Sequence, residues 1–275
     1  MKNILKKIII FLRLLAFNSK FLTRVVDFFI TNILKTDILV KHNHITLKFY
    51  SPNSINYKRI LSFSTKEPET LDWLDKFKPN KVFWDIGSNI GLYSIYATKA
   101  NDTLKCYSFE PMFYNIETLI NNITINKLED RVIVCPFPLN NYSKSSQINY
   151  KYSQWGSSQA NFDSNIDQNG IEYFNHNHFT TLGFSGDDII KISNIEFPNY
   201  IKLDVDGIEI LILNGMNLIL EKVEEILLEV NSEMKLQHNK TSKILNENGL
   251  FLYKICKKGF GPNNHMHNEI YKRNL

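Results

Sequence analysis

The stretch Val82-Phe-Trp-Asp-Ile-Gly-Ser-Asn-Ile-Gly91 decides how the rest of this chain can be interpreted. Apolar residues on both sides of Asp85 predict a buried strand, and Gly87 and Gly91 predict a turn into a helix that opens at residues 91–93. A strand that turns directly into a helix leaves backbone N–H groups free at its carboxyl end, and glycine lets a ligand approach more closely than a Cβ would allow. The stretch therefore predicts a small-molecule site on an α/β sheet.

The composition is that of a globular chain long enough for one α/β domain with a large core, with 275 residues, of which 43% are hydrophobic and 22% are charged. The net charge of +4 gives no general case for nucleic-acid binding, so we expect no nucleic-acid partner. Cys106, Cys135 and Cys256 are odd in number and lack the spacing of a zinc site or a disulfide framework, which favours a reducing compartment. We therefore expect a cytoplasmic protein.

The first 34 residues are apolar and basic. The apolar run over residues 8–17 is interrupted by Arg13 and is shorter than the ~20 residues that a transmembrane helix needs. No small-residue cleavage site follows it, which argues against a signal peptide. Six basic residues and one acid, Asp27, suit a segment that lies against anionic lipid, so we expect residues 1–34 to be able to contact the inner face of the membrane. Helices with one apolar face equally suit a cap on the domain or a contact with a second protomer, and the oligomeric state is left open.

Strands and helices alternate along the rest of the chain. A strand over residues 45–50 and a helix over residues 67–74 precede the glycine stretch, and residues 140–180 are expected to be irregular. Further strands are expected over residues 105–109, 131–136, 200–205, 225–230, 250–256 and 269–273, and helices over residues 114–126, 208–220 and 233–247. This order predicts a Rossmann-like α/β fold with a mostly parallel seven-stranded sheet, helices on both faces and an antiparallel C-terminal hairpin. We divide the chain into an N-terminal helical and short-strand extension, 1–66, and a main domain, 67–275.

In an open α/β sheet, ligands lie outside the carboxyl ends of the strands. Glu110 ends the second strand about 20 residues past the glycine turn, where a carboxylate accepts hydrogen bonds from an adenosine ribose diol. Nicotinamide dinucleotides and S-adenosyl-L-methionine both fit this arrangement. Asn89 replaces the middle glycine of the dinucleotide fingerprint, and Asp85 would repel a pyrophosphate but suits an ammonium and a sulfonium. The residues therefore favour S-adenosyl-L-methionine, with these candidate cofactor-binding residues: Asp85, Gly87, Ser88, Asn89, Gly91 and Glu110.

Several stretches resemble the FkbM family of S-adenosylmethionine-dependent methyltransferases. They read WDIGSNIGLYS, FEPMFYNIETLINNITIN, GFSGDDII, IKLDVDGIEILILNG and ILLEVN, and the resemblance covers roughly residues 67–273. It implies a class I methyltransferase fold and methyl transfer mostly to hydroxyls, typically of sugars in surface glycans or natural products. Carried over residue by residue, the resemblance assigns the glycine turn to the cofactor loop, Glu110 to the ribose, and Lys202, Asp204, Asp206, Gly207 and Glu209 to the fourth-strand motif. Asp206 stands where many members carry Glu.

Asp204 and Asp206 are the best candidates for the catalytic base, because the fourth strand should end beside the cofactor loop. Asp204 could instead cap the following helix, and Lys202, the third catalytic candidate, could balance buried acids instead of contacting substrate. Two carboxylates are also oxygen ligands for a divalent metal, but they are few for a closed site, so a metal is possible and not favoured.

The segment over residues 142–179 mixes aromatic with amide and hydroxyl side chains. Such a mixture suits sugar recognition or a lid that packs on the core. Candidate substrate residues are Trp155, His176, His178 and Glu209, and the two histidines equally suit a surface loop.

We therefore predict an S-adenosylmethionine-dependent O-methyltransferase that acts on a carbohydrate hydroxyl, as in surface polysaccharide biosynthesis. One alternative is a non-catalytic nucleoside-binding module held at a membrane by its N-terminal helices. Another is a methyltransferase that acts on a protein or a lipid.

Overall fold

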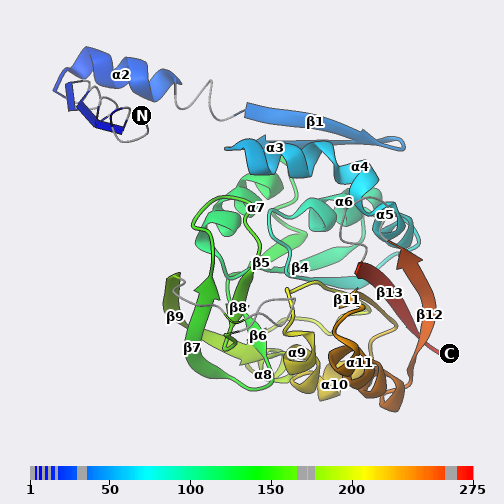
Figure 1. The fold of residues 1–275 in the computed structure, drawn as a ribbon. Helices are drawn as coiled ribbons and strands as arrows, with labels where there is room; N and C mark the ends of the chain where they lie inside the picture. Colours follow the sequence, from blue (N-terminus) through cyan, green and yellow to red (C-terminus); the bar gives the residue numbers. More distant parts are fainter. Residues whose placement is uncertain are drawn as a thin grey trace.

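A seven-stranded sheet forms the centre of the molecule (Figure 1). The computed structural model describes residues 18–29, 36–165, 177–257 and 265–274, together with residues 4, 6, 7, 10, 11, 14, 15 and 172. In spatial order the strands are β12 (Leu250–Lys257), β13 (Met266–Arg273), β11 (Glu225–Asn231), β10 (Tyr200–Leu203), β3 (Val82–Ile86), β4 (Lys105–Phe109) and β5 (Val132–Cys135). β13 runs antiparallel to both of its neighbours, whereas the strands from β11 to β5 are parallel. The predicted sheet and its C-terminal hairpin are confirmed.

The order in which the chain adds strands reverses at β3. β4 and β5 follow it on one side, whereas β10 and β11 lie on the other. Such a reversal leaves a crevice outside the carboxyl ends of the two strands that flank it, and ligands of open α/β sheets bind there. The carboxyl ends of β3 and β10 therefore border the expected site.

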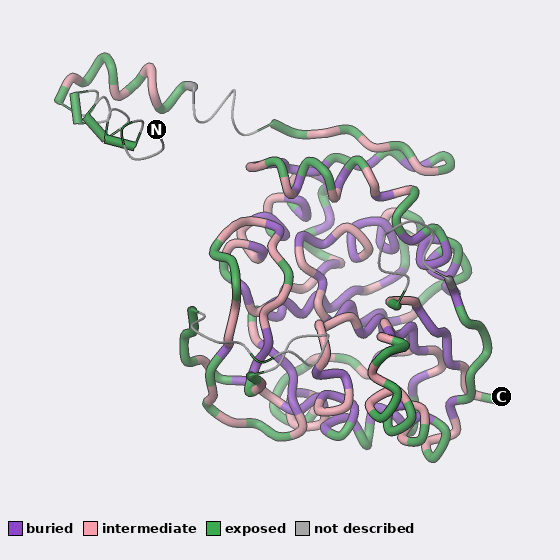
Figure 2. The backbone as a smooth tube through the Cα atoms, in the orientation of Figure 1, coloured by how far each residue is buried: buried purple, intermediate pink, exposed green. Residues whose placement is uncertain are grey.

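Helices cover both faces of the sheet (Figure 1). Side chains alternate along β3, so that Phe83 packs in one apolar cluster with Ile95 and Leu119, whereas Trp84 packs in the other with Ile212. Figure 2 shows the resulting buried backbone along the central strands. The first face carries α5 (Pro68–Leu74), α6 (Leu92–Ala100) and α7 (Phe113–Asn126), and the second carries α8 (Gly186–Ile192), α9 (Glu209–Asn214), α10 (Asn217–Leu220) and α11 (Lys235–Glu247).

Residues 140–180 were expected to be irregular. Residues 166–171 and 173–176 lie outside the described residues, and this prediction is wrong for residues 144–150, 160–162 and 177–180. They contribute to a four-stranded sheet in the order β6 (Leu139–Asn140), β9 (Asn177–Ser185), β7 (Lys144–Tyr150) and β8 (Ala160–Phe162). Much of this sheet is exposed, which suits strands that are rich in Ser, Thr and Asn. Its buried residues include Ile148 of β7 and Phe162 of β8, at 0% and 1% exposure. Hydrogen bonds between paired strands are made by the backbone and need no apolar side chains. The polar composition of these residues therefore gave no indication of a sheet.

The N-terminal part of the chain adds a hairpin and two short helices to the first face. The elements are β1 (Thr36–His42), β2 (Ile45–Ser51), α3 (Ser54–Leu61) and α4 (Phe63–Lys66). Leu47, Phe49 and Phe63 are buried in the same cluster as Ile95 and Leu119 of the main domain. This part of the predicted extension therefore shares its core with residues beyond 67.

Two asparagines of α7 bind the backbone of β2. Asn122 accepts a hydrogen bond from the Tyr50 N–H at 2.7 Å and donates one to the carbonyl of Ile90 at 2.7 Å. Asn126 exchanges two hydrogen bonds with the backbone of Lys48, at 3.1 and 2.6 Å. The hairpin is thus fixed to α7 and, through Asn122, to the glycine turn.

The helix α2 (Lys20–Phe29) lies apart from the sheet and its covering helices (Figure 1). Phe21 and Phe28 of this helix are 73% and 60% exposed. Among the described residues, no helix combines the length and the apolar character needed to cross a membrane.

Truncation of Phe49 to alanine tests whether the hairpin belongs to the folded unit. Phe49 is fully buried, so we expect Phe49→Ala to lower the free energy of unfolding by about 3–5 kcal/mol, measured by urea denaturation. Leu39→Ala on the same hairpin is the matched control, since Leu39 is 63% exposed and should change it by less than about 0.5 kcal/mol. Equal effects of the two substitutions would show that residues before 67 do not share the core.

Candidate active site

A cavity of about 320 Å³ lies at the carboxyl ends of the parallel strands, within the range of small-molecule sites. One wall is the glycine turn after β3, and another is the end of β4 with the residues that follow it. The loop after β10 and the helices α3 and α4 complete it. Its charged and polar lining residues include Arg59, Ser88, Asn89, Glu110, Asp204 and Asp206.

The glycine turn is held against the ends of two neighbouring strands. The N–H groups of Gly87 and Ser88 both donate to the carbonyl of Phe109 at 3.0 Å. Gly87 has φ +83°, and a Cβ at this position would lie 1.9 Å from the backbone oxygen of Asp204. A side chain could not be accommodated here without separating β3 from β10, which explains why this position needs glycine.

Glu110 lies on the wall of the cavity, where its carboxylate binds the glycine turn. One carboxylate oxygen accepts from the Asn89 N–H at 2.9 Å and the other from the Met112 N–H at 2.8 Å. Burial raises the pKa of Glu110 to about 7, although hydrogen bonds from Met112, Asn115 and Asn89 favour the charged form. Each oxygen has a further lone pair, so the carboxylate can still accept from a ligand.

Two residues predicted for the cofactor loop, Asp85 and Gly91, do not line the cavity. Asp85 is fully buried, and its carboxylate accepts from the Ser94 hydroxyl at 2.5 Å, which itself accepts from the Ser108 hydroxyl at 2.8 Å. Burial raises the pKa of Asp85, an effect that Lys202 partly offsets. Gly91, with φ +80°, packs against Leu119. In this arrangement Asp85 ties β3 to the start of α6, and its contact with a cofactor stays a prediction.

Buried Lys202 and partly exposed Asp204 form an ion pair, with 2.6 Å between the ammonium nitrogen and a carboxylate oxygen. Burial alone would lower the pKa of Lys202, but Asp204, Glu67 and Asp85 together raise it, so this side chain stays an ammonium at neutral pH. The ammonium also lies 5.0 Å from the centre of the Tyr93 ring. Lys202 therefore holds Asp204 in place, and of the two only Asp204 can accept a proton.

Asp206 connects the loop after β10 to the segment that covers the cavity, residues 155–159, which we call the covering segment. The carboxylate of Asp206 accepts a hydrogen bond from the Gln159 N–H at 2.8 Å, and the backbone carbonyl of Asp206 accepts one from the side chain of Asn161 at 3.0 Å. The carbonyl of Ser157 in turn accepts from the Asn89 side chain at 2.9 Å. The covering segment is thus fastened to both the glycine turn and the Asp206 loop.

None of the predicted substrate residues that the structure describes lines the cavity. Trp155 donates from its indole nitrogen to Glu117 at 2.8 Å, and His178 is exposed on β9. Glu209 accepts from the Gly207 N–H at 3.1 Å and from Gln237 at 2.9 Å, and burial raises its pKa to about 7. His176 lies outside the described residues.

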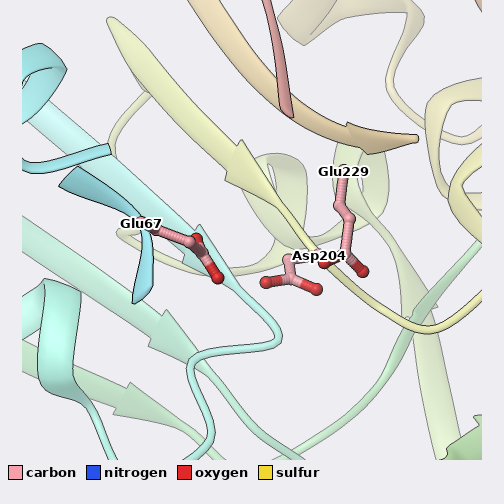
Figure 3. A group of neighbouring side chains, drawn as sticks. All are labelled: Glu67, Asp204 and Glu229. Atoms are coloured by element: carbon pink, nitrogen blue, oxygen red, sulfur yellow. The ribbon is translucent and has the colours of Figure 1, made fainter. Parts of the chain in front are cut away.

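Asp204 and Glu229 of the cavity wall form a cluster of three carboxylates with Glu67, and the sequence motifs assigned a site role to neither of the two glutamates. Figure 3 shows Glu67 reaching from the segment before α5 toward Asp204 and Glu229, whose oxygens lie within 4.8 Å of one another and of Glu67. Such oxygens can bind a divalent cation. The ammonium of Lys202 already brings a positive charge to this cluster, 2.6 Å from Asp204, so we derive no metal site from it. Asp206 is not part of the cluster.

Residues 85–259 match the family model of the methyltransferase FkbM domain. The chain belongs to the FkbM methyltransferase family. The resemblance found in its motifs is therefore confirmed, and the Gly87 turn, Glu110 and Asp204 all lie within the matched FkbM region.

Relatives of this FkbM chain include the hexuronic acid methyltransferase AglP of Haloferax volcanii. The two are 29% identical over 160 residues, which is 58% of this chain and 59% of that protein, so the chain spans less than two thirds of the length of this relative. Among solved structures, a methyltransferase FkbM of Methylobacillus flagellatus KT shares 17% identity over 71% of this chain and 44% of that chain, with a TM-score of 0.46. A precorrin-6y C5,15-methyltransferase of Geobacter metallireducens shares 12% identity over 75% of this chain and 87% of that one, also with a TM-score of 0.46.

The structure adds lining residues from outside the matched FkbM region. Arg59 of α3 and Phe63 and Lys66 of α4 line the cavity. They come from two separate helices, so no single helical pattern in the sequence indicates them. Phe137, just after β5, also lines the cavity, and the rule that ligands lie at strand ends could have found it.

Proposed function

We propose that this FkbM-family protein is an S-adenosylmethionine-dependent O-methyltransferase that methylates a sugar hydroxyl, in a surface glycan or a related metabolite. The observation that carries the proposal is the pair of carboxylates on the cavity: Glu110 beside the glycine turn and Asp204 at the end of β10. Glu110 is placed to accept hydrogen bonds from a ribose diol, and Asp204 is placed to take the proton of the acceptor hydroxyl. A relative named as a hexuronic acid methyltransferase supports a sugar acceptor.

The residues at the glycine turn fit the proposed cofactor. Gly87 lets the chain pass close to β10, and Ser88, Asn89 and Glu110 present polar groups on one side of the cavity. Phe109 and Phe137 line the same cavity and offer apolar surface for an adenine ring. The cofactor supplies an electrophilic methyl group bound to sulfur, so the protein needs mainly to hold the acceptor oxygen in line with it and to exclude water.

Asp204 is the proposed base. It lines the cavity, and the ammonium of Lys202, 2.6 Å from one of its carboxylate oxygens, holds the carboxylate in one orientation. Positioning of the two reactants can contribute about 7–11 kcal/mol, and a well-placed base a further ~10²–10⁴-fold in rate. The covering segment, fastened by Asp206, shields the reacting groups from water.

The pKa of Glu110 predicts that cofactor affinity depends on pH. With a pKa of about 7, the ionised fraction falls about tenfold between pH 8 and pH 6, and a diol donates more strongly to a carboxylate than to the neutral acid. We expect the Kd for S-adenosylmethionine, measured by calorimetry, to rise by up to about tenfold over this interval. Because the pKa of Glu110 is raised in the folded chain, its protonation stabilises the fold as the pH falls from 8 to 6. The loss of cofactor affinity over this interval is therefore not caused by unfolding at this group.

Glu110→Gln is the matched variant for this measurement, and it should bind the cofactor more weakly with an affinity that no longer changes from pH 8 to pH 6. Wild-type binding that is independent of pH, or a variant that binds as tightly as wild type, would contradict the assignment. Binding of the cofactor without methyl transfer to any hydroxylated sugar would favour a non-catalytic module instead. Mass spectrometry of labelled extracts would reveal a protein or lipid acceptor.

Removal of the proposed base should lower the rate of methyl transfer. We expect Asp204→Asn to reduce kcat by about 10²–10⁴-fold at saturating cofactor, because the amide cannot take the hydroxyl proton. Asp102→Asn is the control, since Asp102 is 94% exposed and lies outside the cavity. A kcat for Asp204→Asn within about threefold of wild type would assign the proton transfer to another group.

We also propose that residues 1–34 hold the protein against an anionic membrane surface. The exposed Phe21 and Phe28 of α2 lie on the same helix as Lys20 and Arg24, an arrangement that suits a lipid interface. We expect the full chain to sediment with anionic phospholipid vesicles and residues 36–275 to stay in the supernatant, with vesicles of neutral lipid as the control. Equal partitioning of the two chains would instead favour a cap or a protomer contact.

A further inference from the structure

One wall of the cavity is basic, although its other walls carry acids. Arg59, Phe63 and Lys66 line this wall, and they come from α3 and α4. Phe63 is 1% exposed and anchors the wall in the apolar core, whereas Arg59 is half-buried. The basic wall is therefore a fixed part of the fold.

The guanidinium of Arg59 is oriented by the covering segment. Its Nε donates to the carbonyl of Gly156 at 2.8 Å, and Gly156 is itself held by a hydrogen bond of its N–H to Asn115 at 2.8 Å. This contact uses one of the five N–H donors of the guanidinium and leaves the donors of the two terminal nitrogens for a ligand. Among the described residues, no carboxylate forms an ion pair with Arg59.

The other two cations of the cavity differ from Arg59 in this respect. Lys202 is paired with Asp204 at 2.6 Å, and Lys66 is paired with Glu67 at 2.9 Å. The positive charge of Arg59 is thus the one that a bound molecule could neutralise. A guanidinium binds carboxylates and phosphates through two parallel hydrogen bonds, which gives orientation as well as affinity.

The carboxylates of the cavity favour one orientation of an anionic acceptor. Glu110, Asp204, Asp206 and Glu229 line the walls at the strand ends, where an anionic group would be repelled. An anionic acceptor would therefore bind with its charge at Arg59 and its hydroxyl groups toward Asp204. This orientation brings a hydroxyl to the proposed base.

We propose that Arg59 binds an anionic group of the acceptor, so that the substrate is an acidic sugar instead of a neutral one. The inference rests on the proposed function and specifies its substrate class. The shared chemistry is an oxyanion that accepts two hydrogen bonds, supplied by the carboxylate of a uronic acid or by the phosphate of a sugar phosphate.

The test compares acceptors that differ only in charge. The panel contains a hexuronic acid glycoside, its uncharged carboxamide with the same hydroxyls, and a hexose phosphate, each with saturating S-adenosylmethionine. We expect the wild-type kcat/KM to favour an anionic acceptor over the carboxamide by about 10- to 100-fold, as expected for a charge-assisted hydrogen-bonded pair. The anionic acceptor with the higher kcat/KM shows whether the anionic group is a carboxylate or a phosphate.

Arg59→Gln should bring this preference close to one, while its amide can still donate to the carbonyl of Gly156. Arg59→Lys should keep part of the preference, because lysine keeps the positive charge but lacks the two parallel N–H donors of the guanidinium. Lys58→Gln removes a charge from the neighbouring residue, which does not line the cavity, and should keep the wild-type preference.

Equal use of the acid and the carboxamide by wild type, or a preference that survives in Arg59→Gln, would overturn the inference. Failure of wild type to bind S-adenosylmethionine by calorimetry would overturn the proposed function itself, and the two failures are separable because cofactor binding is measured without an acceptor.

Discussion

The ammonium of Lys202 is the positive charge that stabilises the carboxylates gathered at the carboxyl ends of β3 and β10. The parallel register of β3 and β10 places Lys202 beside Asp85, and its side chain pairs with Asp204. Asp85 and Glu67 are fully buried nearby, so the fold collects several carboxylates where little water can reach them. Without this cation they would repel one another in a poorly solvated place, and an unpaired buried charge destabilises a fold strongly. The same ammonium orients Asp204 on the wall of the cavity.

The sequence was sufficient to predict the central sheet and the position of the site. Long apolar strands and the turn at Gly87 identify β3, and the alternation with helices leads to a parallel sheet whose carboxyl ends must meet. The structure places the cavity there, with Ser88, Asn89 and Glu110 on its walls. These features depend on local pattern and on general rules of topology, which a single sequence contains.

The rest could not be read from the pattern, for physical reasons. β3 is buried on both faces, so periodicity could not show that Asp85 faces Ser94 instead of the cavity. Glu67 reaches the site from outside the sheet, through a contact that depends on tertiary packing. The strands β7 and β9 carry mostly polar side chains, and their few apolar residues do not alternate regularly enough to indicate two paired strands. Trp155 belongs to the covering segment, but its indole is directed to Glu117.

The amides of Asn122 and Asn126 have a further consequence for β2. One edge of this strand pairs with β1, and side chains of α7 take the place of a neighbouring strand beside Lys48 and Tyr50. A strand edge with unpaired backbone groups is a template on which another chain can add by β-pairing. Here the helix ends the ladder, so a second polypeptide cannot extend the hairpin from this side, and the small sheet stays two strands wide.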